Sequence, residues 1–222
     1  MSVRSLEVRC VILGGGGHAI VLIDSLLSMG GIDIAGVLDA RKKPGHDDGV
    51  LGIPVLGGDM LLPRLKDKGV THFVLGLAGT GPNPLREKLW EQALSHGLKP
   101  LSVIHPSVVL SQFSTIGDGV QIFPHSVVNA GASVGQGCIV NTGAIVEHDA
   151  IMEPFSHLSS GARIAGGVRL GRHAFVGSGA TVIQGVSIGR GALVGAGAVA
   201  LHDVGEDDRV VGVPARSIRK SS

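Results

Sequence analysis

From Ile104 to Val194, an aliphatic residue or methionine recurs at every sixth position of the chain. The sixteen positions are Ile104, Leu110, Ile116, Ile122, Val128, Val134, Val140, Val146, Met152, Leu158, Ile164, Leu170, Val176, Val182, Ile188 and Val194. A small residue stands two positions before each of the last fourteen. A period of six fits neither an amphipathic helix nor an alternating strand. It predicts short strands and tight turns that close a triangular coil about every 18 residues, with the aliphatic side chains inside, and such coils stack into a parallel β-helix.

The glycine and aromatic content supports this interpretation. The chain has 36 Gly, one Trp and no Tyr among 222 residues. Several glycines directly follow an inward aliphatic residue, as in Ile116-Gly117, Val134-Gly135 and Val176-Gly177. We expect glycine at the corners to supply the positive φ that tight turns need. The scarcity of aromatic residues agrees with an interior too narrow for large rings.

The first hundred residues follow a different pattern. Residues 6–40 alternate between an apolar strand, a Gly-rich turn, a helix with apolar positions at Ile20, Ile23 and Leu27, and a second strand that ends at Asp39. This is the pattern of a βαβ unit. A strand at residues 71–79 and a helix at residues 84–97 follow. We therefore predict an α/β plus all-β protein, with a small Rossmann-like domain at residues 1–98 and a β-helix with a C-terminal tail at residues 99–222.

Charge, cysteines and the N-terminus narrow the classes of function. A formal net charge of +1 gives no electrostatic footprint for nucleic acid or an anionic membrane. Cys10 and Cys138 lie in apolar segments, which indicates reduced, buried thiols rather than a disulfide. Residues 1–17 lack the features of a signal peptide, and no apolar run reaches the roughly 18 residues that span a bilayer. We expect a cytoplasmic protein without a membrane span or a nucleic-acid partner.

The Gly-rich turn carries the first candidate chemistry. The residues Gly14-x-Gly16-x-x-Ala19 fit a loose dinucleotide fingerprint, and Asp39 follows at the spacing expected for a ribose contact. Backbone N–H groups at the start of the next helix can bind a phosphate, and His18 can add a donor. Alternatively, the glycines only permit a tight turn. Because about a hundred residues are few for a whole NAD(P) site, we expect a mononucleotide half that binds the nucleotide part of a substrate.

The second candidate is the polar trio Glu147, His148 and Asp149. His148 stands two residues after the inward Val146, where a coil side ends and a side chain can leave the prism. Gly166 comes one coil later, so a backbone without a side chain is expected against the imidazole. Glu147 or Asp149 can hold one ring nitrogen and leave the other as a general base. The alternative is a surface histidine between two solvated acids.

Several segments together resemble the sugar O- and N-acyltransferases, a family that includes bacterial nucleotide-linked amino-sugar N-acetyltransferases and the sialic acid O-acetyltransferase. The segments are GGGGHA, VLDA, VIHPSVV, NTGAIVEHD, FSHLSSGARIAGGVRLG and VVGVPAR. The resemblance covers nearly the whole chain. It implies a left-handed β-helix, a homotrimer, and acetyl-CoA as co-substrate without a metal. It also implies that His148 is the general base, that Asp149 supports it, and that the Gly166 N–H binds the thioester oxygen.

The same resemblance implies ligand contacts. The positions that match acetyl-CoA contacts are His157, Gly166, Ser178 and Ala196, and those that match nucleotide-sugar contacts are Gly16, Gly17, His18, Asp39 and Ala78. Two places depart from the family pattern. Ala40 stands where members often have a second acid or polar residue, and residues 78–84 (AGTGPNP) replace a shorter motif.

The predicted activity is N-acetylation of a nucleotide-linked amino sugar of the 4-amino-4,6-dideoxy type, by direct transfer from acetyl-CoA. O-acetylation of a sugar or of sialic acid is the alternative at the same site. Two other classes are a gamma-type carbonic anhydrase-like zinc enzyme, for which His125, His148 and His157 are available, and a non-catalytic assembly module. His148 and His157 fall on different sides of the predicted triangle, which disfavours a shared metal ion.

Overall fold

A computed structural model describes residues 8–44 and 49–218 of the chain. Residues 1–7, on which part of the expectation about the N-terminus rests, lie outside the described residues. The chain divides into two compact units. The first comprises Met1–Ala78 and Leu85–Val103, and the second comprises Gly79–Pro84 and Ile104–Ser222. Residues 79–84 thus group with the second unit although they precede the proposed domain boundary at residues 98 and 99.

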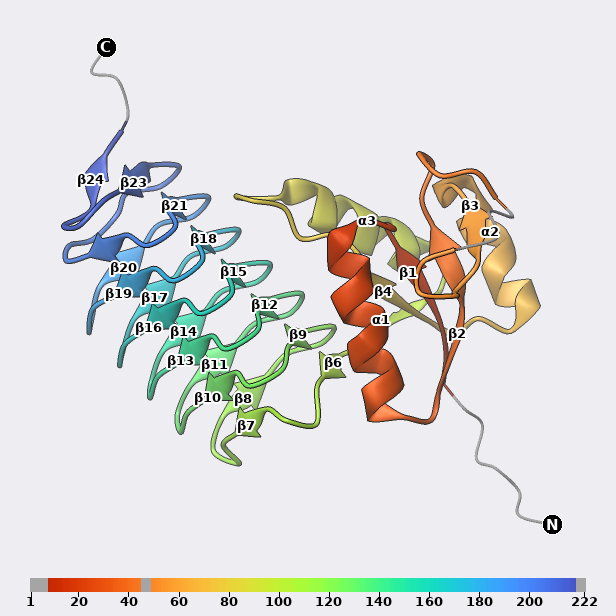
Figure 1. Cartoon of the computed structure of the whole chain (residues 1–222), viewed down its shortest axis with the longest axis horizontal. Coiled ribbons are helices and arrows are strands. Elements are labelled where there is room, and N and C mark those ends of the chain that lie inside the picture. Colours follow the sequence, from red (N-terminus) through yellow and green to blue (C-terminus); the bar gives the residue numbers. More distant parts are fainter. Residues whose placement is uncertain (1–7, 45–48, 219–222) are drawn as a thin grey trace. The chain divides into compact units, whose positions relative to one another are not determined.

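The first unit is built on a five-stranded parallel sheet (Figure 1). Its order is β3-β2-β1-β4-β5, with β1 (Val8–Leu13), β2 (Ile32–Leu38), β3 (Val55–Gly57), β4 (His72–Leu75) and β5 (Lys99–Pro100). The helices are α1 (Gly17–Met29), α2 (Leu62–Leu65) and α3 (Pro84–Ser95), with short 3₁₀ turns η1 (Asp59–Leu61) and η2 (Lys66–Lys68). The small Rossmann-like arrangement predicted from the βαβ pattern is confirmed.

Helix α1 buries a different stripe from the one that its sequence pattern indicated. Of the three apolar positions that predicted the helix, only Ile23 is buried, whereas Ile20 and Leu27 are 47% and 59% exposed. The buried hydrophobic residues of α1 are Ala19, Leu22, Ile23 and Leu26. Apolar residues lie on both the buried and the exposed sides of this helix, so periodicity alone did not identify the buried side.

The second unit is a parallel β-helix on three faces, and its strands up to β22 have two residues each (Figure 1). The first face contains β7 (Val109–Leu110), β10 (Val127–Val128), β13 (Ile145–Val146), β16 (Arg163–Ile164), β19 (Thr181–Val182) and β22 (Val199–Ala200). The second contains β8 (Thr115–Ile116), β11 (Ser133–Val134), β14 (Ile151–Met152), β17 (Arg169–Leu170) and β20 (Ser187–Ile188). The third contains β6 (Val103–Ile104), β9 (Gln121–Ile122), β12 (Ile139–Val140), β15 (His157–Leu158), β18 (Phe175–Val176), β21 (Leu193–Val194), β23 (Arg209–Val211) and β24 (Arg216–Ser217).

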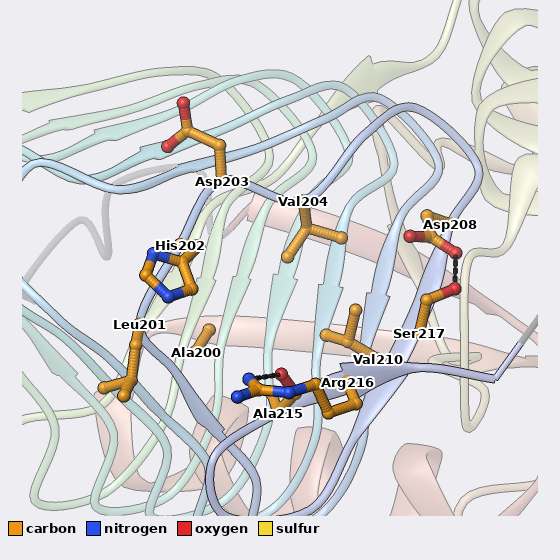
Figure 2. Close-up of a pocket in the computed structure, with 10 residues that line it drawn as sticks. All are labelled: Ala200, Leu201, His202, Asp203, Val204, Asp208, Val210, Ala215, Arg216 and Ser217. Atoms are coloured by element: carbon orange, nitrogen blue, oxygen red, sulfur yellow. Dashed lines mark hydrogen bonds between the residues drawn. The ribbon is translucent and has the colours of Figure 1, made fainter.

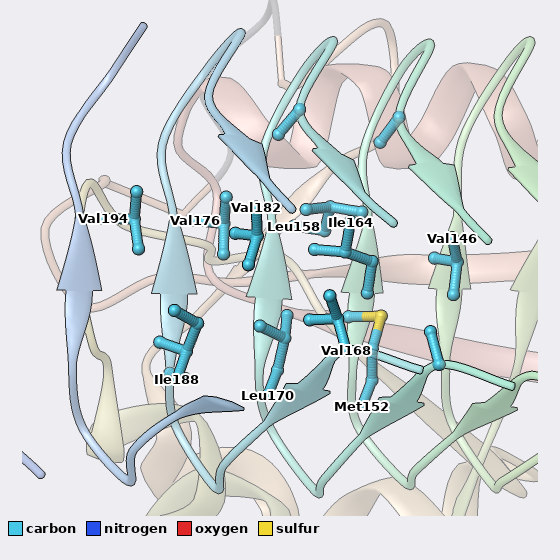
Figure 3. Close-up of a cluster of buried hydrophobic side chains, with 14 of the residues drawn as sticks. Val146, Met152, Leu158, Ile164, Val168, Leu170, Val176, Val182, Ile188 and Val194 are labelled. Atoms are coloured by element: carbon cyan, nitrogen blue, oxygen red, sulfur yellow. The ribbon is translucent and has the colours of Figure 1, made fainter. Parts of the chain in front are cut away.

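The inward positions are those that the period of six predicts. Partners in neighbouring coils are 18 residues apart, as in Ile145 with Arg163. From Ile122 to Val194 every aliphatic or Met of the series is buried, and these side chains fill the interior of the prism (Figure 3). The exceptions are in the first coil, where Leu110 is 38% exposed and Ile104 and Ile116 are only partly buried. Strands β6, β7 and β8 end their sheets, so these residues have a neighbouring coil on one side only.

Two different sets of glycines shape the coils. This corrects the expectation that the glycines directly after the inward residues supply the positive φ of the turns. Glycines directly after the inward residue are required by close approach, since a Cβ on Gly177 would lie 2.6 Å from the backbone nitrogen of Ala196. The second set lies three residues after the inward position, where the backbone has a positive φ, as at Gly137 and Gly167. Asp149 occupies such a position with φ of 58°.

A C-terminal hairpin covers the last coil. β23 continues the third face, and β24 pairs with it in antiparallel orientation. Val199 N–H donates to Gly212 O (3.1 Å), and Ala215 N–H donates to Val199 O (2.8 Å), so the edge of the first face is also paired. Covering exposed edges in this way prevents association of strands from other chains. Of the helices in the described part of the chain, none is sufficiently long and apolar to cross a membrane. The cytoplasmic location stays a prediction.

Candidate active site

His148 lies in the turn between β13 and β14, where the first and second faces meet. Its Nδ1 is 2.9 Å from Asp149 Oδ2, and 58% of its side chain is exposed. The left-handed backbone of Asp149, which aspartate tolerates better than most residues, accompanies this contact. The sequence left open whether Glu147 or Asp149 holds the ring, and the structure assigns this contact to Asp149.

The electrostatic surroundings raise the pKa of His148. The hydrogen bond with Asp149 is the largest cause, and the charges of Asp149 and Glu147 act in the same direction against the opposing effect of partial desolvation. A neutral ring that donates its Nδ1 proton to Asp149 has a lone pair on Nε2. The dyad therefore has the tautomer and the increased basicity that suit a general base.

Gly166 lies against the other side of the imidazole, as the coil register predicts. A Cβ on Gly166 would be 2.5 Å from His148 Nε2 and 2.5 Å from Cε1, so only glycine leaves room for the ring in this position. The next residue, Gly167, donates its N–H to His148 O at 2.9 Å and fixes the two coils together. The Gly166 N–H makes no backbone hydrogen bond with any residue that the structure describes. A spare amide donor and a basic nitrogen thus lie on neighbouring coils.

Glu147 anchors the backbone of this turn. Its Oε2 accepts hydrogen bonds from Asn129 Nδ2 (2.9 Å) and from the His148 N–H (3.3 Å). Asn129 was not identified from the sequence. It stands at the equivalent position of the preceding coil, so the 18-residue spacing was the available signal.

Of the positions that match acetyl-CoA contacts, Gly166 lies beside His148, but the other three lie elsewhere on the β-helix. His157 is in β15 on the third face, 6% exposed, with its ring edge-on to Phe175 at 4.9 Å. Ser178 and Ala196 follow β18 and β21 at the corner between the third and first faces, and both are exposed. Neither of their N–H groups donates a backbone hydrogen bond to a residue within the described ranges. Within one chain, these amides and His148 are therefore separated by the width of the first face.

The Gly-rich turn is held by Asp39. Asp39 Oδ2 accepts a hydrogen bond from the Gly15 N–H (2.9 Å), and Oδ1 accepts from the Arg41 N–H (2.9 Å) and Nε (3.1 Å). These contacts, that from the Arg41 side chain first, hold the pKa of Asp39 well below its usual range. The carboxylate is buried and both oxygens have partners, so a direct contact of Asp39 with ribose or base stays a prediction.

The other predicted nucleotide-sugar residues surround the start of α1 and the end of β4. Gly16 caps α1 without a side-chain hydrogen bond. Gly16 and Gly17 are exposed, and a Cβ on either would meet no atom within 4 Å. His18 is half-buried in the first turn of α1, and Ala78 is 9% exposed shortly after β4. Open space beside the N-terminus of a helix suits a phosphate.

A second His-Asp pair borders a cavity of about 410 Å³ at the C-terminal end of the β-helix (Figure 2). His202 and Asp203 follow β22 and therefore lie at the same corner as His148 and Asp149, three coils later. Asp203 Oδ1 accepts the Ser187 N–H at 2.8 Å. The inward residues Ala200, Val204 and Val210 line the cavity, which makes it the open end of the prism interior.

The two cysteines and the arrangement of metal-ligating side chains bear on the alternative chemistries. Burial raises the pKa of the Cys10 thiol to about 12, and the charge of Asp33 adds to this effect. Cys138 is inside the β-helix with its Sγ 3.0 Å from Glu153 O. Reactive thiols are partly exposed, whereas both of these thiols are buried. Within residues 8–44 and 49–218, no group of three or more His, Cys, Asp or Glu side chains is placed to hold a metal ion.

Comparison with known proteins places this geometry in a family. Residues 9–93 match the family model described as the PglD N-terminal domain. GDP-perosamine N-acetyltransferase of Escherichia coli O157:H7 is 30% identical over 165 residues, which cover 73% of this chain and 63% of that relative. The chain thus matches less than two thirds of the length of this curated relative.

Solved structures cover almost the whole chain. PerB from Caulobacter crescentus, in complex with CoA and GDP-perosamine, is 40% identical, covers 94% of this chain and 96% of its own, and has a TM-score of 0.87. The acetyltransferase domain of PglB from Neisseria gonorrhoeae FA1090, in complex with acetyl coenzyme A, is 32% identical, with coverage of 96% and 100% and a TM-score of 0.88. The shared fold is a small Rossmann-like domain followed by a left-handed parallel β-helix. This chain belongs to the sugar acyltransferase family.

Proposed function

We propose that this protein is an acetyl-CoA-dependent N-acetyltransferase that acts on a nucleotide-linked amino sugar. The observation that carries the proposal is the arrangement around His148, with Nδ1 on Asp149 and Nε2 beside the backbone of Gly166. The relatives support the choice of substrates, since PerB binds CoA and GDP-perosamine and the PglB domain binds acetyl coenzyme A. A 4-amino-4,6-dideoxy sugar is the acceptor that we expect.

The mechanism is direct acyl transfer. The acceptor amine attacks the thioester carbon, a C–N bond forms, and His148 Nε2 takes the proton that the amine loses. The Gly166 N–H stabilises the oxyanion of the tetrahedral intermediate. When the C–S bond breaks, the imidazolium returns its proton to the departing thiolate. Asp149 orients the ring and stabilises its charged form without receiving the proton. The reaction forms no acyl-enzyme.

We propose a homotrimer with acetyl-CoA between neighbouring β-helices. The amides of Ser178 and Ala196 and the His148 turn lie at different corners of one chain, so a single chain does not bring them onto one groove. A threefold assembly of triangular prisms can place one such corner of each chain against the other corner of its neighbour. His157 and Gly166 complete the proposed contacts. Light scattering of the active protein should give a trimer, and a fully active monomer would refute the assembly.

The α/β unit is proposed to bind the nucleotide through Gly16, Gly17, His18, Asp39 and Ala78. Asp39→Ala releases the Gly15 N–H and Arg41 from the turn. We expect the KM for the sugar nucleotide to rise about tenfold, with much less change in the KM for acetyl-CoA, because a ground-state contact remote from the reacting atoms is lost. Steady-state kinetics with each substrate varied in turn measures both values. Equal effects on both KM values would argue against the assignment.

The decisive experiment measures acetyl transfer to a panel of nucleotide-linked sugars. We expect turnover with amino sugars and CoA release in equal amount to the amide formed. Transfer to a hydroxyl sugar and not to any amine would favour O-acetylation. Zinc at one equivalent per chain together with hydration of carbon dioxide would favour the lyase. Absence of acetyl-CoA binding would favour the assembly module.

A further inference from the structure

We propose that Gly131, in the coil before His148, is a positioning residue of the active site, because its missing side chain leaves the space that the Asp149 carboxylate occupies beside the imidazole. The inference rests on the proposed role of His148 as the general base. It adds a residue that acts on His148 only through Asp149.

Gly131 and Asp149 occupy the same place in successive turns of the β-helix. Gly131 follows β10, and Asp149 follows β13, which pairs with β10 on the first face with a spacing of 18 residues (Figure 1). The Gly131 N–H donates to Phe113 O (3.1 Å), and the Asp149 N–H donates to Ala130 O (3.2 Å). Backbone hydrogen bonds therefore hold these turns against one another.

The carboxylate of Asp149 lies where a side chain at position 131 would be. A Cβ on Gly131 would collide with Asp149 Oδ1 and would lie 3.4 Å from Cγ. The other oxygen, Oδ2, is 2.9 Å from His148 Nδ1. One oxygen of the carboxylate thus contacts the imidazole, while the other fills the space above the glycine. A carboxylate displaced from this space would rotate about its Cα–Cβ bond and carry Oδ2 away from the ring.

The backbone conformation at position 131 does not by itself require glycine. Gly131 has a φ of 74°. His125 and Phe155 have left-handed φ values of 58° and 59° at other corners of the same β-helix. Left-handed turns of this β-helix therefore accept residues with large side chains. The space that Asp149 occupies is the feature that distinguishes position 131.

Two other glycines are crowded in the same way. A Cβ on Gly137 would lie 2.5 Å from the ring of Phe155, and a Cβ on Gly191 would collide with the carboxylate of Asp207. In both cases, as for Gly131, the residue 18 positions later has a left-handed backbone and a side chain. A side chain in such a turn therefore folds back over the glycine of the preceding coil.

Gly185 shows the opposite state at the corner that carries Gly131. Its φ of 73° nearly equals that of Gly131, but a Cβ on Gly185 would meet no atom within 4 Å. The residue 18 positions later is Asp203, whose carboxylate accepts the Ser187 N–H instead. A carboxylate over the glycine thus accompanies the dyad of His148, and an empty glycine accompanies the second His-Asp pair.

The contact that Gly131 permits controls the basicity of His148. The hydrogen bond with Asp149 is the largest cause that raises the pKa of His148, and the charges of Asp149 and Glu147 add to it. The neighbouring turns, residues 129–131 before and 165–167 after, contain no titratable side chain. Displacement of the Asp149 carboxylate should therefore lower the pKa of His148.

Titration of the His148 imidazole in Gly131→Ala tests the inference without acetyl transfer. NMR of protein with ¹³C-labelled histidine measures the pKa, and His148→Ala identifies the signal. We expect the pKa in Gly131→Ala to fall to the value in Asp149→Asn, and kcat to fall about tenfold or more because the base loses its orientation. Gly185→Ala is the matched control, with the same backbone conformation and open space, and should titrate and turn over like the wild type.

A double variant separates positioning from a general loss of structure. In Gly131→Ala combined with Asp149→Asn, the pKa of His148 should fall no further than in Asp149→Asn alone, because the charge that the new Cβ displaces is already absent. A second fall of equal size would show that Gly131 acts on His148 by a route other than Asp149.

The outcomes separate this inference from the proposed function. An unchanged titration in Gly131→Ala, or an equal shift in Gly185→Ala, overturns the positioning role. A lowered pKa with unchanged kcat supports the positioning role and argues against His148 as the general base. If Gly131→Ala does not fold, Gly131→Asn places a Cβ at the same point with a residue that tolerates left-handed backbone, and the same two titration results decide.

Discussion

The same corner of the β-helix carries two His-Asp pairs, and only one of them is arranged as a dyad. His148 Nδ1 lies 2.9 Å from Asp149 Oδ2, whereas Asp203 accepts the Ser187 N–H and the structure assigns it no hydrogen bond to His202 among the residues that it describes. The two pairs occupy equivalent positions after β13 and β22. A matching dipeptide at a matching corner therefore does not by itself make a basic histidine.

The neighbouring coil provides the second difference. β13 is followed on its face by β16, which places the Gly166 backbone beside the imidazole of His148. β22 is the last strand of that face, and the C-terminal hairpin pairs with it instead. His202 thus borders an open cavity and lacks a glycine in a following coil (Figure 2). Two features therefore distinguish the proposed active site from the second pair. The carboxylate of Asp149 contacts the imidazole of His148, and the next coil places Gly166 beside that ring.

The largest expected difference is between the two histidines. His148→Ala should lower kcat by roughly 10²-fold or more because it removes the proposed general base. His202→Ala is the matched control and should keep wild-type turnover. Steady-state kinetics of both variants, with calorimetric binding of acetyl-CoA to verify an intact fold, makes the comparison. An equal loss of kcat in the two variants would contradict the claim that only His148 acts as the general base.

The glycine beside the ring gives the next effect. Gly166→Ala puts a Cβ 2.5 Å from the present position of His148 Nε2, so the imidazole must move. We expect turnover to fall about tenfold to a hundredfold, since misplacement of a catalytic group by about 1 Å is enough for such a loss. Gly205→Ala is the control, because its Cβ would meet no atom within 4 Å. A Gly166→Ala enzyme with wild-type kcat would show that the close approach is not needed.

The smallest effect concerns stability at the second pair. Asp203→Ala removes the acceptor of the Ser187 N–H and should lower the free energy of unfolding by about 1 kcal/mol or less, because that amide can bind water instead. Turnover should not change. Chemical denaturation and kinetics on the same preparation measure both quantities. Loss of activity with unchanged stability would assign a functional role to this pair.

Much of the β-helix follows from the sequence because its register repeats. Each coil adds 18 residues, so the inward positions and the meeting of His148 with Gly166 follow from counting. What counting does not give is the direction of a side chain within a turn. Asp149, and not Glu147, contacts the imidazole of His148. The backbone of Asp149 is left-handed, and the carboxylate of Glu147 is hydrogen-bonded to Asn129 instead.

The α/β unit was less predictable in detail. Its βαβ order followed from the alternation of strands and helices, but no repeat fixes which side chains meet. Arg41, two residues beyond Asp39, donates hydrogen bonds to the carboxylate that was expected to face the nucleotide. The pocket that Ala40 and Leu61 line is formed by segments that follow two different strands, and only the sheet order β3-β2-β1 reveals that these segments are close together.

The pH dependence of kcat/KM in the wild type, Asp149→Asn and Asp203→Asn tests the central claim most directly. A general base acts in its neutral form, so the rate should fall as pH drops through the pKa of His148, which lies above the ordinary histidine value because of Asp149. Asp149→Asn keeps a residue that tolerates positive φ and removes the charge, so the acidic limb should move to lower pH and the maximal rate should fall. The substrate amine titrates identically in all three enzymes, so a shift between variants belongs to the protein. The account predicts a shift in Asp149→Asn and none in Asp203→Asn. An unchanged acidic limb in Asp149→Asn would contradict it.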